Sequence, residues 1–221
     1  MIQKARDAGI YTIVSTNAQS LSPDLAKAIV QSGLNRIIVS MDGLTQQTYQ
    51  SYRRGGSVEQ VYEALRLLRY YKNQLKSRMQ IELQCLRLKT NEYEWQSMRR
   101  QYRSLGADKM TFKTAQFLNF ANGNSLMPTH ERDSRYTKHS DGLYYNKYHH
   151  RSVCRRLFMG CVMDVDGNIL PCCFDKHRKY SFGSLNNQPF SECWHSNTAE
   201  IYRNRVLTHR QTIAICTNCT E

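Results

Sequence analysis

The sequence predicts an α/β domain built on a parallel sheet, followed by a small cysteine-rich domain. Two observations predict this. β-rich apolar runs alternate with amphipathic stretches through residue 118, and four cysteines then gather in the last third of the chain. Near-continuous apolar strands separated by helices are typical of a parallel sheet that helices cover. The alternation places strands at residues 11–16, 36–41, 79–88 and 109–114.

Helices are predicted between these strands. The first begins at the cap residue Ser22 and ends at Gly33. The second repeats apolar residues at helical spacing over residues 58–68, and the third runs over about residues 92–105. Polar side chains at the strand ends are candidate ligand contacts, because ligands collect at the carboxyl ends of parallel strands. The other interpretation is that these polar residues only form turns.

Length and composition narrow the class of protein. A chain of 221 residues that is 40% hydrophobic and 22% charged is globular and buries a core without needing disulfides. It has no apolar run long enough to span a membrane, and residues 1–7 are not followed by the apolar core of a signal peptide. We therefore expect a cytoplasmic protein with no membrane partner, in which clustered thiols favour metal over disulfides.

The formal charge of +13 allows two interpretations. Residues 52–113 hold fourteen Lys and Arg against six Asp and Glu, a net charge of +8. Such a segment attracts nucleic acid or an acidic substrate, and the tyrosine-rich basic run at residues 144–151 would suit base stacking. The other interpretation is that these charges lie on solvated helix faces. This interpretation is favoured, because many of the arginines fall opposite an apolar stripe. A basic nucleic-acid-binding protein is kept as an alternative.

Four cysteines are spaced like the ligands of an iron–sulfur cluster. Twelve residues, Gly167 and four more residues separate Cys154 from Cys172, and a C-x2-C pair, Cys216 and Cys219, closes the chain. Thiolates select iron–sulfur clusters or zinc, and four complete one site. Structural zinc is thus the rival interpretation. A hairpin over residues 162–170, turning at an Asp-Gly pair, would return Cys172 beside Cys154.

The remaining cysteines are assigned other roles. Cys173 is next to a candidate ligand, and neighbouring strand residues point to opposite faces, so both are not expected to reach one metal. The others are expected to be small buried hydrophobes, and a histidine replacing a thiolate at a zinc site is considered less favourable. Those cysteines are Cys85, Cys161 and Cys193, and those histidines are His177 and His209.

Three segments resemble the middle of a radical S-adenosylmethionine (SAM) enzyme. They are S-T-N-A at residues 15–18, I-V-S-M-D-G at 38–43 and Y-R-R-G-G at 52–56. Residues 154–219 resemble the SPASM domain, the auxiliary-cluster extension of many of these enzymes, and P-C-C-F-D-K and C-x-N-C-T-E occur here as in short radical SAM/SPASM proteins. The resemblance implies the C-terminal four strands of a partial (β/α) barrel at residues 1–118, a linker at 119–153 and a SPASM domain at 154–221.

The resemblance also implies site residues and cofactors. Ser40 and Asp42 would lie beside the ribose and methionyl parts of SAM, and Thr16 and Asn17 would line the same site. Arg53 would bind the SAM carboxylate, since a planar guanidinium suits bidentate recognition, with Arg54 as the fallback. An auxiliary 4Fe-4S cluster would bind Cys154, Cys172, Cys216 and Cys219.

The sequence departs from the family at its start. The C-x3-C-x2-C run of the catalytic cluster does not occur, and residues 1–9 resemble the end of the helix after the second barrel strand. We therefore expect the C-terminal part of a longer enzyme or the product of a shortened gene, not competent alone, with the catalytic cluster only in a full-length parent. The implied partners are a peptide, protein or small-metabolite substrate and an electron donor such as flavodoxin or ferredoxin.

Overall fold

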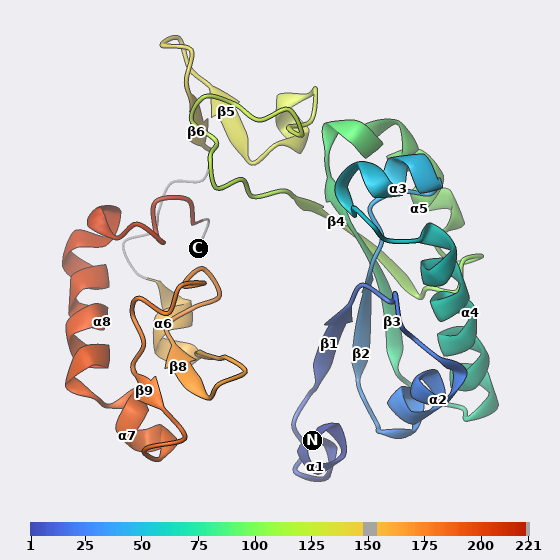
Figure 1. Ribbon diagram of the computed structural model, residues 1–221, viewed down its shortest axis with the longest axis horizontal. Coiled ribbons are helices and arrows are strands. Elements are labelled where there is room, and N and C mark those ends of the chain that lie inside the picture. Colours follow the sequence, from blue (N-terminus) through green and yellow to red (C-terminus); the bar gives the residue numbers. More distant parts are fainter. Residues whose placement is uncertain (148–153, 220–221) are drawn as a thin grey trace. The chain divides into compact units, whose positions relative to one another are not determined.

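The predicted parallel sheet is present, with its strands in the order β1-β2-β3-β4 (Figure 1). This computed structural model describes residues 1–147 and 154–219. Strand order follows chain order without reversal, and right-handed crossovers then place the connecting helices on one face, as in a barrel wall. The strands are β1 (Ile13–Thr16), β2 (Arg36–Ser40), β3 (Gln80–Arg87) and β4 (Lys109–Thr114).

Two of the predicted helices are confirmed, and the third differs. Ser22 and Ser57 begin α2 and α4 by accepting the N–H groups of Leu25 and Gln60. The predicted helix at residues 92–105 is instead a 3₁₀ helix followed by a short α-helix, because the Asn91 side chain bonds backbone groups at its start. The helices of this unit are α1 (Ile2–Asp7), α2 (Pro23–Gln31), α3 (Gln46–Tyr52), α4 (Val58–Gln74), η1 (Lys89–Glu94) and α5 (Trp95–Gln101).

The two faces of the sheet differ in character. Ile37 and Val39 of β2 are fully buried and pack in one core with Leu65 and Leu68 of α4. Alternate residues of β2, including Ser40, are half-buried on the opposite face. One face therefore holds the helices, and the other presents polar groups at the strand ends.

Strand β1 lies at an edge of the sheet and is largely exposed. Ile13 and Val14 keep 44% and 36% of their surface accessible, although β2 beside them is buried. Natural proteins usually cover or charge such an apolar edge, because its unpaired backbone groups can pair with another strand.

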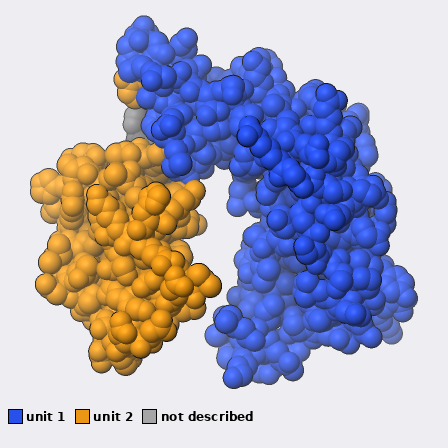
Figure 2. Space-filling view, in the orientation of Figure 1, with its two compact units in different colours: residues 1–144 blue, residues 145–221 orange. Residues whose placement is uncertain are grey.

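Residues 116–144, which include much of the predicted linker, form a small cluster with β3 and η1. The Tyr136 hydroxyl accepts the Phe117 N–H at 2.9 Å, and the Tyr136 ring stacks on Phe120. The chain divides into residues 1–144 and 145–221 (Figure 2), while the domain limits expected from the sequence stay a prediction. The elements here are η2 (Glu131–Asp133), β5 (Tyr136–Lys138) and β6 (Tyr144–Asn146), and β5 pairs with β6.

The second unit contains the predicted hairpin as part of an antiparallel sheet ordered β7-β8-β9. Its turn is held by Asp164, whose carboxylate accepts the N–H groups of Asp166 and Asn168 at 2.9 Å and pairs with Arg178 at 2.7 Å. The elements are α6 (Arg155–Met159), β7 (Val162–Met163), β8 (Asn168–Leu170), β9 (Gly183–Ser184), α7 (Phe190–Trp194), α8 (Asn197–His209) and η3 (Arg210–Thr212).

The structure bears on two of the partners considered from the sequence, a membrane and nucleic acid. Among the described residues, no helix is both long and apolar enough to cross a membrane. The tyrosine-rich basic run proposed for base stacking falls partly outside the described residues, at Tyr148, His149, His150 and Arg151.

Asp108 joins the helical layer to the sheet. Its carboxylate accepts the Ile81 N–H at 2.8 Å and pairs with Arg69 and Lys72 of α4 at 2.6 Å. Burial alone would raise the pKa of Asp108, but these hydrogen bonds outweigh burial and hold the pKa below its ordinary value of 3.8. The stabilisation is therefore complete above the unfolded-chain pKa and is lost as the pH falls through the folded value.

Replacing Asp108 tests this connection. In Asp108→Asn, we expect the free energy of unfolding at pH 7 to fall by about 2 kcal/mol, because charged hydrogen bonds are lost. The difference from the wild type should begin to shrink below about pH 4, where Asp108 of the unfolded chain takes up a proton, while the folded carboxylate, with its lowered pKa, is protonated only at lower pH. Urea denaturation at pH 7 and pH 3 measures both values, with the exposed Asp7→Asn as control. A difference that persists unchanged at pH 3 would contradict this role.

Candidate functional site

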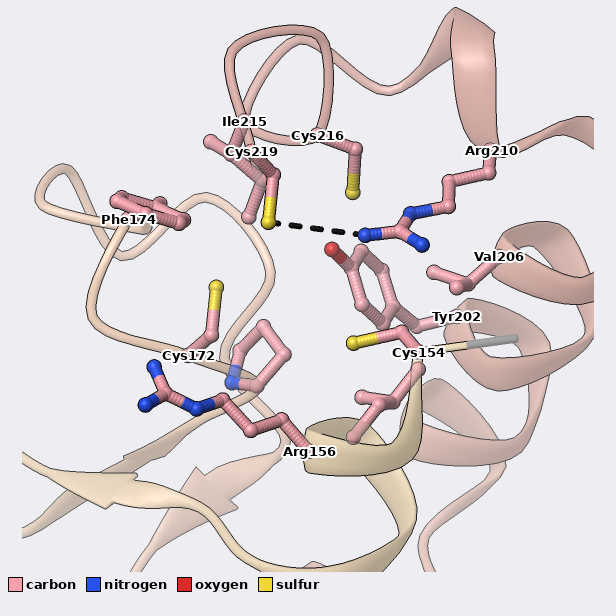
Figure 3. Close-up of a pocket in the computed structure, with 12 residues that line it drawn as sticks. Cys154, Arg156, Cys172, Phe174, Tyr202, Val206, Arg210, Ile215, Cys216 and Cys219 are labelled. Carbon is pink, nitrogen blue, oxygen red and sulfur yellow. Dashed lines mark hydrogen bonds between the residues drawn. The ribbon is translucent and has the colours of Figure 1, made fainter. Parts of the chain in front are cut away.

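The four candidate ligand cysteines come from separate parts of the second unit and line one pocket. Cys154 is the N-cap residue of α6, and Cys172 follows the end of β8. Cys216 and Cys219 lie on one turn, in which the Cys219 N–H donates to the Cys216 carbonyl at 3.1 Å. Figure 3 shows the four sulfur atoms facing the same space.

The pocket is largely apolar and partly closed to water. Cys216 and Cys219 are 8% and 5% exposed, whereas Cys154 and Cys172 are half-buried. All four are free thiols. The remaining wall is contributed mainly by apolar side chains, including Leu157, Pro171, Phe174, Val206 and Ile215.

Burial favours the protonated form of two of these thiols, Cys172 and Cys216. It raises the pKa of Cys172 to about 11, and neighbouring cysteines add to this rise. It also raises the pKa of Cys216, although the Tyr202 hydroxyl and Arg210 oppose the rise. Anionic thiolates gathered in an apolar pocket need compensating positive charge, and bound metal ions supply such charge.

Two polar side chains not predicted from the sequence face these thiols. The Arg210 guanidinium, on a residue only 5% exposed, donates through Nη2 to Cys219 Sγ at 3.6 Å (Figure 3). The Tyr202 hydroxyl points into the same pocket and lowers the pKa of the Cys216 thiol (Figure 3). Tyr202, Val206 and Arg210 are spaced i, i+4, i+8, so one helical face leads into the pocket. A charged residue on that face, just before a C-x2-C pair, is the signal that could have found Arg210.

The other cysteines lie away from this pocket. Cys85 and Cys193 are fully buried, as expected. Cys193 lies in the apolar core of the second unit, whereas Asn91 donates to Cys85 Sγ at 3.5 Å, and burial raises the pKa of Cys85. The expectation that Cys161 is buried is wrong: Cys161 is exposed immediately before the short strand β7. Cys173 is also exposed and, unlike Cys172, does not line the four-cysteine pocket.

The described side chains do not form a ligand set for a single metal ion. Over residues 1–147 and 154–219, no three His, Cys, Asp or Glu side chains are placed so that they could hold one metal ion. Both histidines weighed as zinc ligands, His177 and His209, are exposed and do not line the pocket.

The five predicted SAM-site residues lie at or after the carboxyl ends of β1 and β2. Thr16 Oγ1 accepts the Ala18 N–H at 2.9 Å, and Asn17 Oδ1 accepts the Gln19 N–H at 3.3 Å. These two side chains therefore hold the turn after β1. Ser40 is half-buried at the end of β2, level with Gln84 of β3.

Asp42 has a structural role that the sequence did not reveal. The residue is 1% exposed, and its carboxylate accepts the Leu86 N–H and Arg53 Nε–H, both at 2.6 Å. Asn91 donates to the Asp42 carbonyl at 3.0 Å. Asp42 thereby joins the end of β2 to the end of β3 and to the residue that follows α3.

Arg53 is oriented by this carboxylate and remains partly accessible. Its side chain is 28% exposed, and within the part of the chain that the structure describes it forms an ion pair through Nε with Asp42. Its terminal nitrogens are therefore suited to bidentate binding of a ligand carboxylate. Arg54, the fallback residue, is exposed.

Comparisons with known proteins agree with this fold. The Radical SAM superfamily profile matches residues 1–79, and the SPASM iron-sulfur cluster-binding domain profile matches residues 154–220. The protein is an α/β chain of radical SAM type with a C-terminal SPASM region. It belongs to the radical SAM/SPASM family. No curated protein matches the chain in a separate search.

Solved structures share the fold at low sequence identity. The structure of anSMEcpe with bound AdoMet has a TM-score of 0.65 and 12% identity, covering 95% of this chain and 61% of that chain. Streptococcus suis SuiB bound to S-adenosylmethionine has a TM-score of 0.53 and 14% identity, covering 99% of this chain and 56% of that chain. The present chain thus spans less than two thirds of the length of each.

The buried Asp42 carboxylate can be tested directly. Asp42→Asn would direct an amide NH₂ group at Arg53 Nε–H or Leu86 N–H, so one buried donor would lose its acceptor. We expect the free energy of unfolding to fall by about 3 kcal/mol, as when one partner of a buried pair is removed. Chemical denaturation measures the change. Glu63→Gln, which removes an exposed pair with Arg66, should change stability far less, because water screens that pair. Equal effects of the two substitutions would show that burial of Asp42 does not matter.

Proposed function

We propose that this chain is the C-terminal part of a radical SAM/SPASM enzyme and carries an auxiliary 4Fe-4S cluster together with part of the SAM site. The observation that carries the proposal is the pocket formed by Cys154, Cys172, Cys216 and Cys219. Four thiols from distant parts of the chain share one apolar pocket, and soft thiolate ligands in such surroundings suit an iron–sulfur cluster. Structural zinc is the rival occupant of the same ligands.

The donor set fits a cluster in charge as well as in ligand type. Burial disfavours thiolate anions in this pocket, and the positive charge of bound iron would reverse that preference. Cys154 and Cys172 would hold the group from α6 and the hairpin, and Cys216 and Cys219 from the C-terminal turn. When bound in enzymes of this family, SAM and the catalytic cluster supply radical chemistry that removes a hydrogen atom from a substrate.

The first unit would contribute one side of the SAM site. Arg53, held by Asp42, would bind the SAM carboxylate, and Ser40 would approach the ribose or methionyl part. Thr16 and Asn17 would shape the adjoining turn. The exposed edge strand β1 supports the idea of a partial barrel, since an apolar edge is expected where a sheet continues. In this proposal, the radical-generating cluster takes its ligands from outside residues 1–221.

The substrate is proposed by chemistry and by analogy. One solved structure similar in fold is anSMEcpe with bound AdoMet and the Cp18Cys peptide, at 14% identity. We propose a peptide or protein substrate for the present enzyme, with a small metabolite as the alternative. A flavodoxin or ferredoxin would supply electrons in the cytoplasm.

Metal analysis tests the proposed cluster. After anaerobic reconstitution with iron and sulfide, we expect the wild-type chain to hold about four iron and four sulfide per chain, the content of one 4Fe-4S cluster. Cys172→Ala should lose most of this content, because one thiolate ligand is removed. Cys173→Ala is the matched control: it removes the adjacent exposed thiol and should retain the cluster. Iron, sulfide and zinc are quantified together, and zinc without sulfide would refute the cluster.

Ligand discrimination tests the assignment of Arg53. We expect Arg53→Met to weaken binding of SAM by about tenfold or more, the size of a lost charged hydrogen bond. Binding of decarboxylated SAM should change much less, because this ligand lacks the carboxylate that Arg53 would contact. Isothermal titration calorimetry measures both affinities. The ratio of the affinity for SAM to that for decarboxylated SAM separates recognition of the carboxylate from a general destabilisation of the protein. Arg54→Met is the control. An equal loss for both ligands would contradict carboxylate binding by Arg53.

A further inference from the structure

Arg210 is a buried cation in the wall of the four-cysteine pocket. It lies in η3, directly after α8, and is 5% exposed. Its Nη2 atom donates to Cys219 Sγ at 3.6 Å, and its positive charge lowers the pKa of the nearby Cys216 thiol. Figure 3 shows the guanidinium directed toward the same space as the cysteine sulfurs. A single arginine therefore hydrogen-bonds to Cys219 and acts electrostatically on Cys216.

The chemistry of these contacts favours negatively charged sulfur. A neutral thiol is a weak hydrogen-bond acceptor, and burying a guanidinium is costly unless its partners carry compensating charge. Thiolates bound to a cluster are much better partners, because hydrogen bonds between ions are shorter and stronger. The guanidinium of Arg210 is therefore stabilised most when Cys216 and Cys219 are deprotonated and ligate metal.

Tyr202 adds a second donor from the same helical face. It is 6% exposed, and the centroid of its ring lies 4.9 Å from that of Tyr180 and 5.9 Å from that of Phe182. These ring contacts hold the Tyr202 hydroxyl in the pocket, where it lowers the pKa of Cys216 (Figure 3). Cys219 receives a hydrogen bond from Arg210.

We propose that Arg210 and Tyr202 are positioning residues that raise the reduction potential of the auxiliary cluster, an inference that rests on the proposed function. One-electron reduction adds a negative charge to the cluster and its thiolates. A buried cation and a hydroxyl donor stabilise that added charge more than they stabilise the oxidised form. The effect is strong because the pocket is apolar, whereas a cation in water is largely screened.

The chain offers a matched control for the charge of Arg210. Arg205 lies on α8, five residues before Arg210, but is exposed to solvent. Arg205→Gln and Arg210→Gln remove the same formal charge from the same part of the chain. They differ in burial and in contact with the cysteine sulfurs. Tyr202→Phe removes only the hydroxyl donor and keeps the aromatic packing.

Redox titration of the reconstituted full chain tests the proposal. Dithionite supplies the electron, and electron paramagnetic resonance reports the reduced fraction at each potential. We expect Arg210→Gln to lower the equilibrium constant for one-electron reduction about tenfold, which is a potential about 59 mV more negative. Tyr202→Phe should shift the potential in the same direction by a smaller amount, and Arg205→Gln should match the wild type.

The outcomes separate this inference from the cluster itself. Full iron and sulfide content with wild-type potentials in Arg210→Gln and Tyr202→Phe would overturn the tuning role while leaving the cluster in place. Absence of iron and sulfide from the wild-type chain would overturn both. If Arg210→Gln does not fold, Tyr202→Phe decides: a more negative potential supports the inference, and an unchanged potential refutes it. A shift in Arg205→Gln equal to that in Arg210→Gln would also refute it.

Discussion

The carboxylate of Asp42 is the interaction on which the strand-end geometry depends. It is buried at the end of β2 and accepts both the Leu86 N–H and the Arg53 Nε–H at 2.6 Å. A carboxylate accepts hydrogen bonds at both oxygens without donating any, so no other side chain of this size serves two donors as well. Asp42 therefore fixes the end of β3 and the Arg53 side chain, which follows α3, relative to each other. Ligands of parallel sheets commonly bind at such strand ends.

The sequence predicted the sheet better than the connections around it. The strands were found because β-rich segments alternate regularly with amphipathic ones, and α2 and α4 because apolar residues recur at helical spacing. Helix α3 (Gln46–Tyr52) was missed because it is polar and buries little beyond Thr48 and Tyr49. The predicted helix at residues 92–105 changed form because the Asn91 side chain bonds the nearby Leu88 and Leu86 and also the Asp42 carbonyl, which is distant in sequence.

In the cysteine pocket, too, the sequence predicted some features and missed others. Ligand spacing and the hairpin at residues 162–170 were enough to predict which thiols meet, because the turn at Gly167 determines where Cys172 returns. Arg210 was missed because an isolated arginine is ordinarily interpreted as surface charge, and its burial depends on how α8 packs. Cys161 was expected to be buried from residue type alone, but β7 begins just after it and leaves it exposed.

Two costs in the second unit oppose each other when no metal is bound. Burial raises the pKa of Cys172 and Cys216 and so favours neutral thiols, yet a neutral thiol is a weaker acceptor than a thiolate for the N–H that Arg210 donates to Cys219. Metal binding would reduce both costs, since bound iron would keep the sulfurs deprotonated and the thiolates would then stabilise the guanidinium. Cluster binding and the stability of this unit would therefore be coupled, with Arg210 as the side chain through which the fold responds to the charge of the cluster.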